Sequence, residues 1–350
     1  MSKARELANL GNAYSDGALS NRNVIANGAM VVSQRGASFT SVGNGDYTLD
    51  RFRVYSSGGG VFNVDQASDG PDDFTKSLKV TVATNDASIG SSDYYLLNTR
   101  LEGYNTAQFN FGSSTAKTLT LSFYVKSSLT GTFGGSFTNS SEVKAYVFTY
   151  TINSANTWER KTVTISGATD GTWSTDNTNS VRIYWDLGCG SGSLSGSTGW
   201  SAASSYGFSG SVQLVGTSSA TWQITGVQLE VGDTATPFEH RSYGDELARC
   251  QRYYEVIDIL DGYASDPTIV YGRGFFAVRK RVAPSLVITG SSIYAETPYV
   301  HGASVASTSI VAHGLEESGA GIRVTNFYGF TGGNYAWIRG RDNVAFDAEL

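Results

Sequence analysis

Residues 227–255, VQLEVGDTATPFEHRSYGDELARCQRYYE, contain the boundary that decides the fold. They begin within an expected strand, 223–230, which closes a β-sandwich. Ser242 and Asp245 then approximate a capping box, and the residues that follow are good helix formers. We therefore expect a short helix over 242–254 that opens a second module.

Upstream of this boundary, from residue 23 to residue 241, short runs rich in β-branched and aromatic residues alternate with clusters of Gly, Ser, Asn and Asp. This spacing is typical of strands joined by turns, and it predicts a sandwich. Between Thr118 and Lys126 apolar and polar residues alternate, so one side of that strand should pack and the other should face solvent. The expected strands are 49–55, 60–66, 77–83, 92–102, 118–126, 143–151, 159–165, 181–187 and 223–230.

Downstream of the helix, strand-like runs return and predict a second, smaller β domain. Its closing segment, FDAEL, is expected to be an edge strand. The first 22 residues are too short to fold alone and form a separate segment. The expected organisation is a segment 1–22, a β-sandwich 23–241, a linker helix 242–256 and a C-terminal β domain 257–350. The strands expected after the helix are 268–278, 285–288, 309–312, 321–330 and 335–339.

The charge balance argues against nucleic acid as a partner. The formal net charge is -6 and the pI is near 5.2, whereas phosphate binding needs clustered Lys and Arg. Residues 1–25 lack the apolar stretch of a secretory signal, and no run of about 18 apolar residues is present, so membrane insertion is not expected. Cys189 and Cys250 cannot make a disulfide framework and fit synthesis in a reducing cytoplasm.

Sequence motifs for catalysis are missing, so we do not expect an enzyme. The chain has no G-x-S-x-G elbow, P-loop, H-E-x-x-H or C-x-x-C. His240, His301 and His313 stand apart from other metal ligands, and His240 is expected to have a structural role. The run DGPDDF at 69–74 could offer oxygen ligands to calcium, but it lacks the spacing of a calcium loop, so no cofactor is expected.

Aromatic residues in loops are the best candidates for binding. The face of a sugar ring stacks on Trp or Tyr while polar neighbours bind its hydroxyl groups. Trp173 and Trp200 lie in polar loops, and Tyr206 ends the low-complexity stretch 188–206. These three residues are therefore candidate glycan-binding residues. The tryptophans expected in the core instead, because they lie in or beside strands, are Trp158, Trp185 and Trp222.

The boundary stretch also resembles a known family. Residues 228–241 and 246–254 are similar to the signature QLE-x-G-x-x-ATPFE-x-R…EL-x-x-C-x-RYY of bacteriophage tail-fibre and related virion structural proteins. The resemblance implies a virion location, attachment of segment 1–22 to other virion proteins, and a homotrimer. It further implies that the C-terminal domain is a receptor-binding tip. The receptor-facing residues that it implies are Tyr299, Tyr328 and Asn334.

The order of elements in the first domain is similar to that of jelly-roll carbohydrate-binding modules. LSFYVK, a hairpin, NTWERKTVTI, VRIYWDLG and a closing WQITGVQLEVG follow one another over residues 27–239. Together the resemblances imply an all-β protein, a jelly-roll β-sandwich with a linker helix and a smaller C-terminal β domain, that attaches a virion to host surface glycan. A capsid decoration or adaptor protein with a purely structural role is the alternative. A glycan depolymerase is less favoured and would need two carboxylates across a groove.

One face of the expected helix allows two interpretations. Leu247, Cys250 and Tyr254 are spaced i, i+3 and i+7 and form a narrow apolar stripe. In a lone domain this stripe would cover the sandwich, whereas in the trimer that the resemblance implies it would meet another helix. These three residues are the candidate oligomerisation residues.

Overall fold

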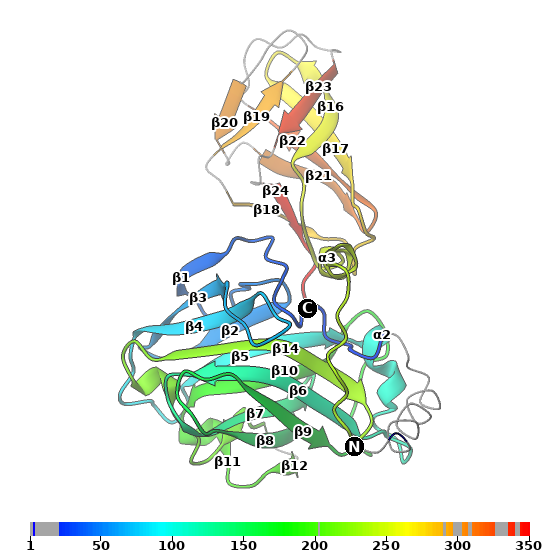
Figure 1. Cartoon of the computed structure of the whole chain (residues 1–350). Coiled ribbons are helices and arrows are strands. Elements are labelled where there is room, and N and C mark those ends of the chain that lie inside the picture. Colours follow the sequence, from blue (N-terminus) through cyan, green and yellow to red (C-terminus); the bar gives the residue numbers. More distant parts are fainter. Residues whose placement is uncertain are drawn as a thin grey trace. The chain divides into compact units, whose positions relative to one another are not determined.

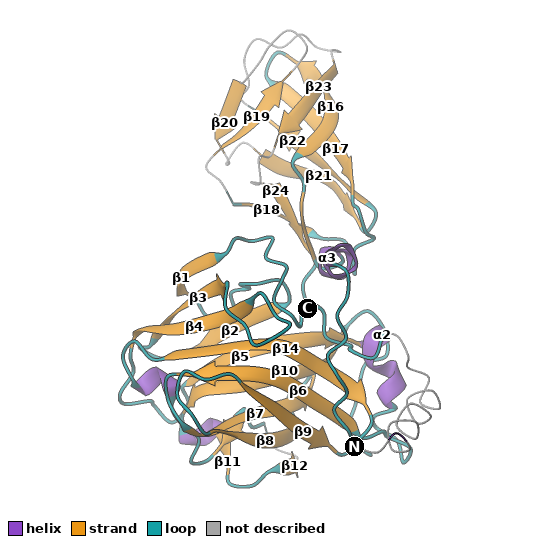
Figure 2. Ribbon diagram, in the orientation of Figure 1, coloured by secondary structure: helices purple, strands orange, loops and turns teal. Residues whose placement is uncertain are grey.

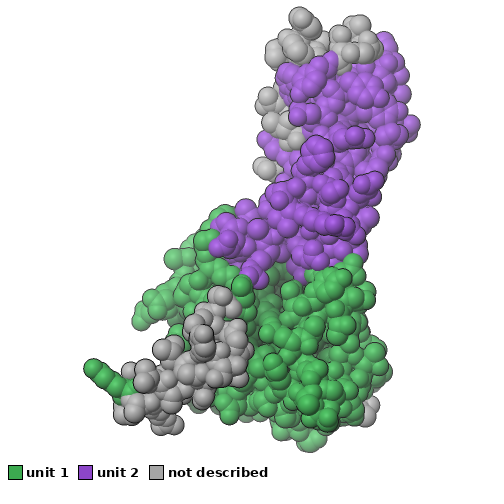
Figure 3. All heavy atoms as spheres, turned by 90° about the vertical axis from the view of Figure 1, so that its right-hand side faces the viewer, with its two compact units in different colours: residues 1–243, 350 green, residues 244–349 purple. Residues whose placement is uncertain are grey.

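A computed structural model describes Lys3 and residues 21–201, 204–289, 292–296, 303–306, 310–325, 335–339 and 344–350. The chain divides into two compact units, residues 1–243 with Leu350 (unit 1) and residues 244–349 (unit 2) (Figure 3). Both units are built from strands (Figure 2), as the sequence predicts. Apart from Lys3, Asn21 and Arg22, the predicted anchoring segment 1–22 lies outside the described residues.

Unit 1 is a jelly-roll β-sandwich of two six-stranded sheets (Figure 1). All strand pairs in both sheets are antiparallel. Sheet A has the order β1 (Ser38–Val42), β3 (Val61–Ala67), β4 (Ser77–Thr84), β14 (Thr221–Val231), β6 (Leu119–Ser127) and β9 (Glu159–Ile165). Sheet B has the order β12 (Gly199–Ser201), β8 (Ala145–Ile152), β7 (Gly131–Asn139), β10 (Asn179–Cys189), β5 (Tyr94–Glu102) and β2 (Phe52–Ser56).

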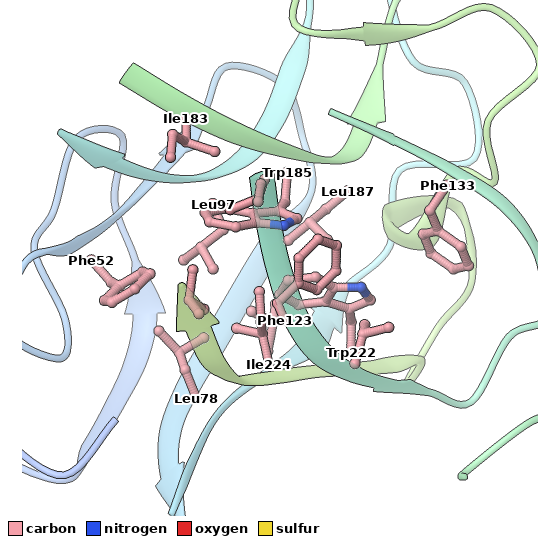
Figure 4. Close-up of a cluster of buried hydrophobic side chains, with 14 of the residues drawn as sticks. Phe52, Leu78, Leu97, Phe123, Phe133, Ile183, Trp185, Leu187, Trp222 and Ile224 are labelled. Atoms are coloured by element: carbon pink, nitrogen blue, oxygen red, sulfur yellow. The ribbon is translucent and has the colours of Figure 1, made fainter. Parts of the chain in front are cut away.

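The core of unit 1 lies between the two sheets and is rich in aromatic rings. Figure 4 shows Trp185 from sheet B close to Phe123 and Trp222 from sheet A. The rings of Phe123 and Trp185 meet edge to face at 5.9 Å, a favoured aromatic geometry. Trp185 and Trp222 are fully buried, which confirms their expected place in the core. The expectation for Trp158 is wrong: it is half-buried outside the core, beside Lys126.

The outer side of sheet A is partly covered, which the alternation in β6 did not predict. Thr120 and Ser122 point away from the core yet are buried. The cause is the segment after β14, which folds back over the sheet, and Thr120 Oγ1 donates a hydrogen bond of 2.8 Å to the carbonyl of Gly232. We call residues 228–241 the linker clasp.

A buried glutamate holds the linker clasp together. Glu230, only 3% exposed, accepts hydrogen bonds from the Gln228 side-chain amide at 2.9 Å and from the backbone N–H of Thr236 at 2.9 Å. The Thr236 hydroxyl donates to its second oxygen at 2.7 Å. The Gln228 oxygen in turn accepts from the backbone N–H of Glu239 at 2.8 Å. Backbone groups in a segment without regular structure cannot pair within a helix or a sheet. When they are buried, side chains such as these supply their hydrogen-bond partners.

The far end of the linker clasp binds the first described residues of unit 1. The Glu239 carboxylate accepts hydrogen bonds from the backbone N–H groups of Asn21 at 2.5 Å and Asn23 at 2.8 Å. Arg241 forms an ion pair with Glu239 at 3.2 Å and donates to the carbonyl of Ile25 at 3.1 Å. Residues 228–241, the first part of the motif that resembles the tail-fibre signature, therefore have an architectural role within unit 1.

Short helices that the sequence did not predict lie between strands of unit 1. The helix α2 (Gly103–Thr106) follows β5, and a 3-10 turn, Ala107–Phe109, continues it. Two further 3-10 turns are Ser191–Ser193 and Leu214–Gly216.

Unit 2 contains the expected helix and a second β fold. Helix α3 (Tyr243–Gln251) begins at the boundary, as predicted. A three-stranded sheet has the order β15 (Tyr254–Val256), β24 (Val344–Asp347) and β18 (Ser285–Ile288). A seven-stranded sheet has the order β20 (Ala303–Ala306), β19 (Ser292–Glu296), β23 (Tyr335–Arg339), β16 (Ile259–Asp266), β17 (Ile269–Phe275), β22 (Gly319–Val324) and β21 (Ile310–Glu316).

The closing strand of unit 2 and most of the apolar stripe Leu247, Cys250 and Tyr254 are packed against other parts of the same chain. β24 is central in the three-stranded sheet, so the expected edge strand is wrong: it pairs with β15 and β18 on its two sides. Cys250 is fully buried and Tyr254 is 2% exposed, whereas Leu247 is half-buried. The described fold therefore already buries two of the three candidate oligomerisation residues. Cys189 and Cys250 are both buried thiols.

Candidate functional site

The low-complexity stretch forms a strap over the outer side of sheet B. We call residues 190–212 the strap, of which 202 and 203 lie outside the described residues. It adds β12 to the edge of the sheet beside β8, and it returns through β13 (Gly207–Phe208), which pairs in parallel with β11 (Leu194–Ser195). Trp200, which was expected in a loop, therefore lies on the short strand β12.

Glycines let the strap lie directly on the sheet. A Cβ atom on Gly134 of β7 would lie 2.8 Å from the backbone nitrogen of Phe208. A Cβ atom on Gly207 would lie 2.1 Å from Oδ2 of Asp186 in β10. Both distances are too short for a side chain, so each of these positions requires glycine.

The structure brings Trp173 and Trp200 together, although they are separated in the sequence. Their ring centroids are 5.9 Å apart, and both rings pack edge to face on Phe111, at 4.9 Å and 6.0 Å respectively. The indole N–H of Trp200 donates to the carbonyl of Ser166 at 2.7 Å, and that of Trp173 to Asp170 at 3.0 Å. Both residues are half-buried against the core. Their indole N–H groups are already used in hydrogen bonds to backbone carbonyls.

Tyr206 belongs to a different group, a row of tyrosines on the outer side of sheet B. Its ring centroid is 5.0 Å from that of Tyr184 and 5.8 Å from that of Tyr94. Tyr184 is in turn 6.3 Å from Tyr55. Tyr55, Tyr94 and Tyr206 are half-buried and offer ring surface to solvent, while Tyr184 is 2% exposed and lies between them. We call these four residues the tyrosine face.

Charged groups fix the orientation of these rings. The Glu142 carboxylate accepts hydrogen bonds from the hydroxyl groups of Tyr184 and, at 3.2 Å, Tyr206, and it forms an ion pair with Arg182. Arg100 donates to the Tyr55 hydroxyl. Burial raises the pKa of Tyr206 to about 12, so its hydroxyl remains a hydrogen-bond donor at neutral pH. The tyrosine face therefore combines stacking surface with held hydrogen-bonding groups.

Beneath the strap, sheet B carries a row of buried polar side chains. Asn98, Ser136, Thr138 and Asp186 alternate with core residues along three neighbouring strands, and all are fully buried. One polar atom of each has no hydrogen-bond partner among the described residues. Burial raises the pKa of Asp186 to about 6, and the Gly188 backbone N–H donates to its Oδ1 at 2.9 Å. Such a polar layer is costly without partners.

Sequence reasoning found Tyr206 and missed its partners. In VRIYWDLG, residues 181, 183 and 185 face the core, so Tyr184 must face outward with Arg182 and Asp186. That alternation could have identified Tyr184 as an outward-facing residue. Its position near Tyr94 and Tyr55 depends on the order of the strands in the sheet, which the alternation does not give. Three of the candidate glycan-binding residues lie outside the described residues: Tyr299, Tyr328 and Asn334.

The described residues also bear on a metal site and on a membrane span. They contain no group of three or more His, Cys, Asp or Glu side chains placed to hold a metal ion. The Asp69 carboxylate of the DGPDDF run forms an ion pair with Lys126 and accepts from the Trp158 indole N–H at 3.2 Å. None of the helices in this part of the chain combines the length and the hydropathy that a bilayer span requires.

Comparisons with known proteins give likenesses of fold to unit 1. No protein-family model matches this sequence, and no curated protein matches it. The enzymatically active domain of tailspike protein 4 of bacteriophage CBA120 is 12% identical with a TM-score of 0.34, over 60% of this chain and only 22% of the tailspike chain. The carbohydrate-binding module CBM4 is 16% identical with a TM-score of 0.31, over 59% of this chain and 99% of its own.

A third solved structure is a complex with a sugar. TmCBM61 bound to beta-1,4-galactotriose is 9% identical with a TM-score of 0.32, over 61% of this chain and 100% of that chain. At these identities and TM-scores the likenesses carry no inference about what this chain binds. The candidate function has to rest on the side chains of the chain itself.

Proposed function

We propose that unit 1 binds glycan through the tyrosine face. The observation that carries this proposal is the continuous row of four tyrosine rings, with successive centroids 5.0 to 6.3 Å apart, on one side of sheet B. Pyranose rings present C–H groups that stack on aromatic faces, and their hydroxyl groups need hydrogen-bond partners at the ring edges. Arg100, Arg182 and Glu142 lie at those edges.

The hydrogen bonds of the tyrosine face support binding more than catalysis. Glu142 is held by Arg182 and by two tyrosine hydroxyl groups, and Asp186 is buried beneath Gly207. Glycoside cleavage by two carboxylates requires both to reach the scissile bond from opposite sides. Neither of these carboxylates is arranged in that way, so the proposed activity is non-enzymatic adhesion. Orienting the rings in advance reduces the ordering cost when the ligand binds.

Replacing Tyr206 with alanine tests the proposal. We expect binding to a glycan found on an array of bacterial surface oligosaccharides to weaken about tenfold, equivalent to about 1.4 kcal/mol. Tyr206→Phe is the matched variant, because it retains the ring and removes only the hydroxyl group that bonds to Glu142. It should bind nearly as well as the natural chain. Binding would be measured by isothermal titration calorimetry, and folding by thermal melting.

A control outside the tyrosine face makes this test specific. Trp158→Ala removes a half-exposed ring from the other sheet, where it lies 5.0 Å from the Lys126 ammonium, and should leave binding unchanged. Equal binding by the Tyr206→Ala variant and the natural chain would refute the tyrosine face as the site. Absence of glycan binding by the natural chain, together with binding to virions, would favour the decoration or adaptor role.

The proposed setting is the surface of a bacteriophage particle. The similarity of residues 228–241 and 246–254 to the tail-fibre signature supports a virion protein whose segment 1–22 contacts other virion proteins. In a homotrimer three weak glycan sites would act together, which raises the overall affinity without new contacts. Light scattering of the full chain is expected to give the mass of three copies of the 37.3 kDa chain. A monomer mass would contradict this part of the proposal.

A further inference from the structure

We propose that a hollow on the exposed side of the seven-stranded sheet of unit 2 is a second saccharide site. It has a volume of about 570 Å³ and lies over β16, β17, β22 and β21. Its walls include Tyr263, Tyr271, Arg273, Phe275, His313 and Glu316. These residues are distinct from the tyrosine face of unit 1, so the inference does not depend on the function proposed for that face.

Aromatic rings line the hollow and remain exposed. Tyr263 and Tyr271 stack with their planes 23° apart and their centroids 5.6 Å apart, and the His313 ring is 4.8 Å from Tyr271. Tyr263 is 52% exposed and Phe275 is 83% exposed, and because both border the hollow they add to one exposed apolar patch. Tyr335 extends the row beyond Tyr263, its cross-strand neighbour, and is 53% exposed.

Glycines form the floor of the hollow. Along β22, Ala320, Ile322 and Val324 are buried in the core, so Gly319 and Gly321 occupy the outward positions. Gly321 pairs with Arg273 on one side and with Gly314 on the other, and Gly319 pairs with Phe275. Without side chains at these positions, the sheet surface is open between the flanking rings.

A Cβ atom added to Gly319 would lie 2.9 Å from the Gly274 carbonyl oxygen, so crowding explains that glycine, but it does not explain Gly321. A Cβ atom added to Gly321 would meet its nearest neighbour, the Gly314 carbonyl oxygen, at 3.6 Å, which is an ordinary van der Waals distance. Glycine weakens the interior of a strand, and it often marks a place where a ligand approaches the backbone. Gly321 therefore fits a surface that receives a ligand.

Polar groups beside the rings indicate the class of ligand. The side chains of Arg273 and Glu316 make no hydrogen bond or ion pair with other described residues, and both border the hollow. Together with the His313 imidazole they provide donors and acceptors next to aromatic faces, the combination that sugar hydroxyl and ring C–H groups require. A concave surface of this volume is in the range for small ligands, so a short oligosaccharide is the expected occupant.

A second copy of the chain is the competing occupant. Burial of an exposed aromatic surface such as Phe275 would favour self-association. The hollow is, however, bordered by Arg273 and Glu316, which carry charges of opposite sign. An interface with a second copy would bury both charges, and burying a charge without a matched partner is costly. The geometry therefore favours a saccharide.

Two variants of the full chain test the inference. Tyr271→Ala removes a stacking ring, and Gly321→Val places a side chain in the hollow, where its Cβ atom has room, while adding a good strand former. Each is expected to weaken binding of an oligosaccharide selected on an array of bacterial surface glycans by about tenfold or more at the unit 2 site. Gly321→Val should not lower the melting temperature. Tyr104→Ala, which removes a 63% exposed ring in unit 1, is the matched control.

The outcomes separate this inference from the function proposed for unit 1. Weaker binding with Tyr271→Ala and Gly321→Val, but not with Tyr206→Ala, would support the unit 2 site and oppose the tyrosine face. Weaker binding with Tyr206→Ala alone, or no bound glycan at all, would overturn the unit 2 site. Conversion of an oligomer to a monomer by Gly321→Val, without an effect on glycan binding, would identify the hollow as a contact between copies.

Discussion

Glu230→Ala is expected to lower the free energy of unfolding of unit 1 by about 3 kcal/mol, because it leaves buried donors without an acceptor. The Gln228 amide, the Thr236 backbone N–H and the Thr236 hydroxyl all donate to this carboxylate, at 2.9, 2.9 and 2.7 Å. Removing one partner of a buried hydrogen bond costs more than the bond itself contributes, because the remaining group stays desolvated. The linker clasp should then detach from sheet A.

Equilibrium unfolding in urea, followed by tryptophan fluorescence, measures this effect. Five of the six tryptophans lie in unit 1 and only Trp337 lies in unit 2, so the signal reports mainly on the sandwich. Asp233→Ala is the matched control, because Asp233 is an exposed carboxylate of the same segment. It should change stability by less than about 0.5 kcal/mol. Limited proteolysis should cleave near Arg241 faster in Glu230→Ala alone.

An unchanged midpoint for Glu230→Ala would mean that the hydrogen bonds of the linker clasp do not stabilise unit 1. The motif would then need another explanation, such as a contact with a partner chain. The residue identities of this segment indicated a family resemblance, but their local role became visible only when the structure placed Gln228 and Thr236 around the buried carboxylate of Glu230.

Strands with clear alternation were predictable, and the central strand β7 was not. Segment 118–126 coincides closely with β6, because its apolar residues recur at every second position. β7 carries Gly131, Gly134 and Gly135, and glycine is depleted in strands. Its glycines are needed by non-local packing: Gly134 lies under the strap, and a Cβ atom on Gly135 would lie 2.4 Å from the Phe148 ring. Such requirements come from distant residues and leave no local pattern.

The candidate site was only partly predictable for the same reason. Loop position suggested exposure for Trp173 and Trp200, but each places its indole N–H on a loop carbonyl and its ring on Phe111. The tyrosine face requires β2, β5 and β10 to be neighbours, and strand order cannot be read from periodicity. Tyr206 was a candidate from the sequence and the outward position of Tyr184 was predictable, whereas their grouping with Tyr55 and Tyr94 required the fold.

Asp186→Asn is expected to increase the stability of unit 1 at neutral pH, with a gain that disappears in acid. An aspartate in an unfolded chain has a pKa of about 3.9, whereas burial raises the pKa of Asp186 to about 6. Between these values the folded state binds more protons than the unfolded state. The contribution of Asp186 to stability is therefore full below about pH 4 and is lost as the pH rises to about 6. A difference of about two pKa units corresponds to about 3 kcal/mol.

Urea unfolding of the natural chain and of Asp186→Asn at pH 4 and pH 7.5 measures this linkage. Other carboxylates titrate in both proteins, so the stability difference between the two proteins isolates Asp186. That difference should favour the variant by about 3 kcal/mol more at pH 7.5 than at pH 4. Asp72→Asn, which changes an exposed carboxylate in the same way, should give a pH-independent difference near zero.

Ionisation of Asp186 should also affect how firmly the strap packs on sheet B, because Oδ2 of Asp186 lies directly beneath Gly207. An ionised carboxylate in that place gains free energy by reaching water, and water reaches it when the strap lifts from the sheet. Amide hydrogen exchange at Gly207 and Phe208 should therefore quicken between pH 5 and pH 7 beyond its intrinsic pH dependence, and Asp186→Asn should remove the excess. A stability difference that is equal at pH 4 and pH 7.5 would show that Asp186 titrates normally and that the strap admits water in the folded state.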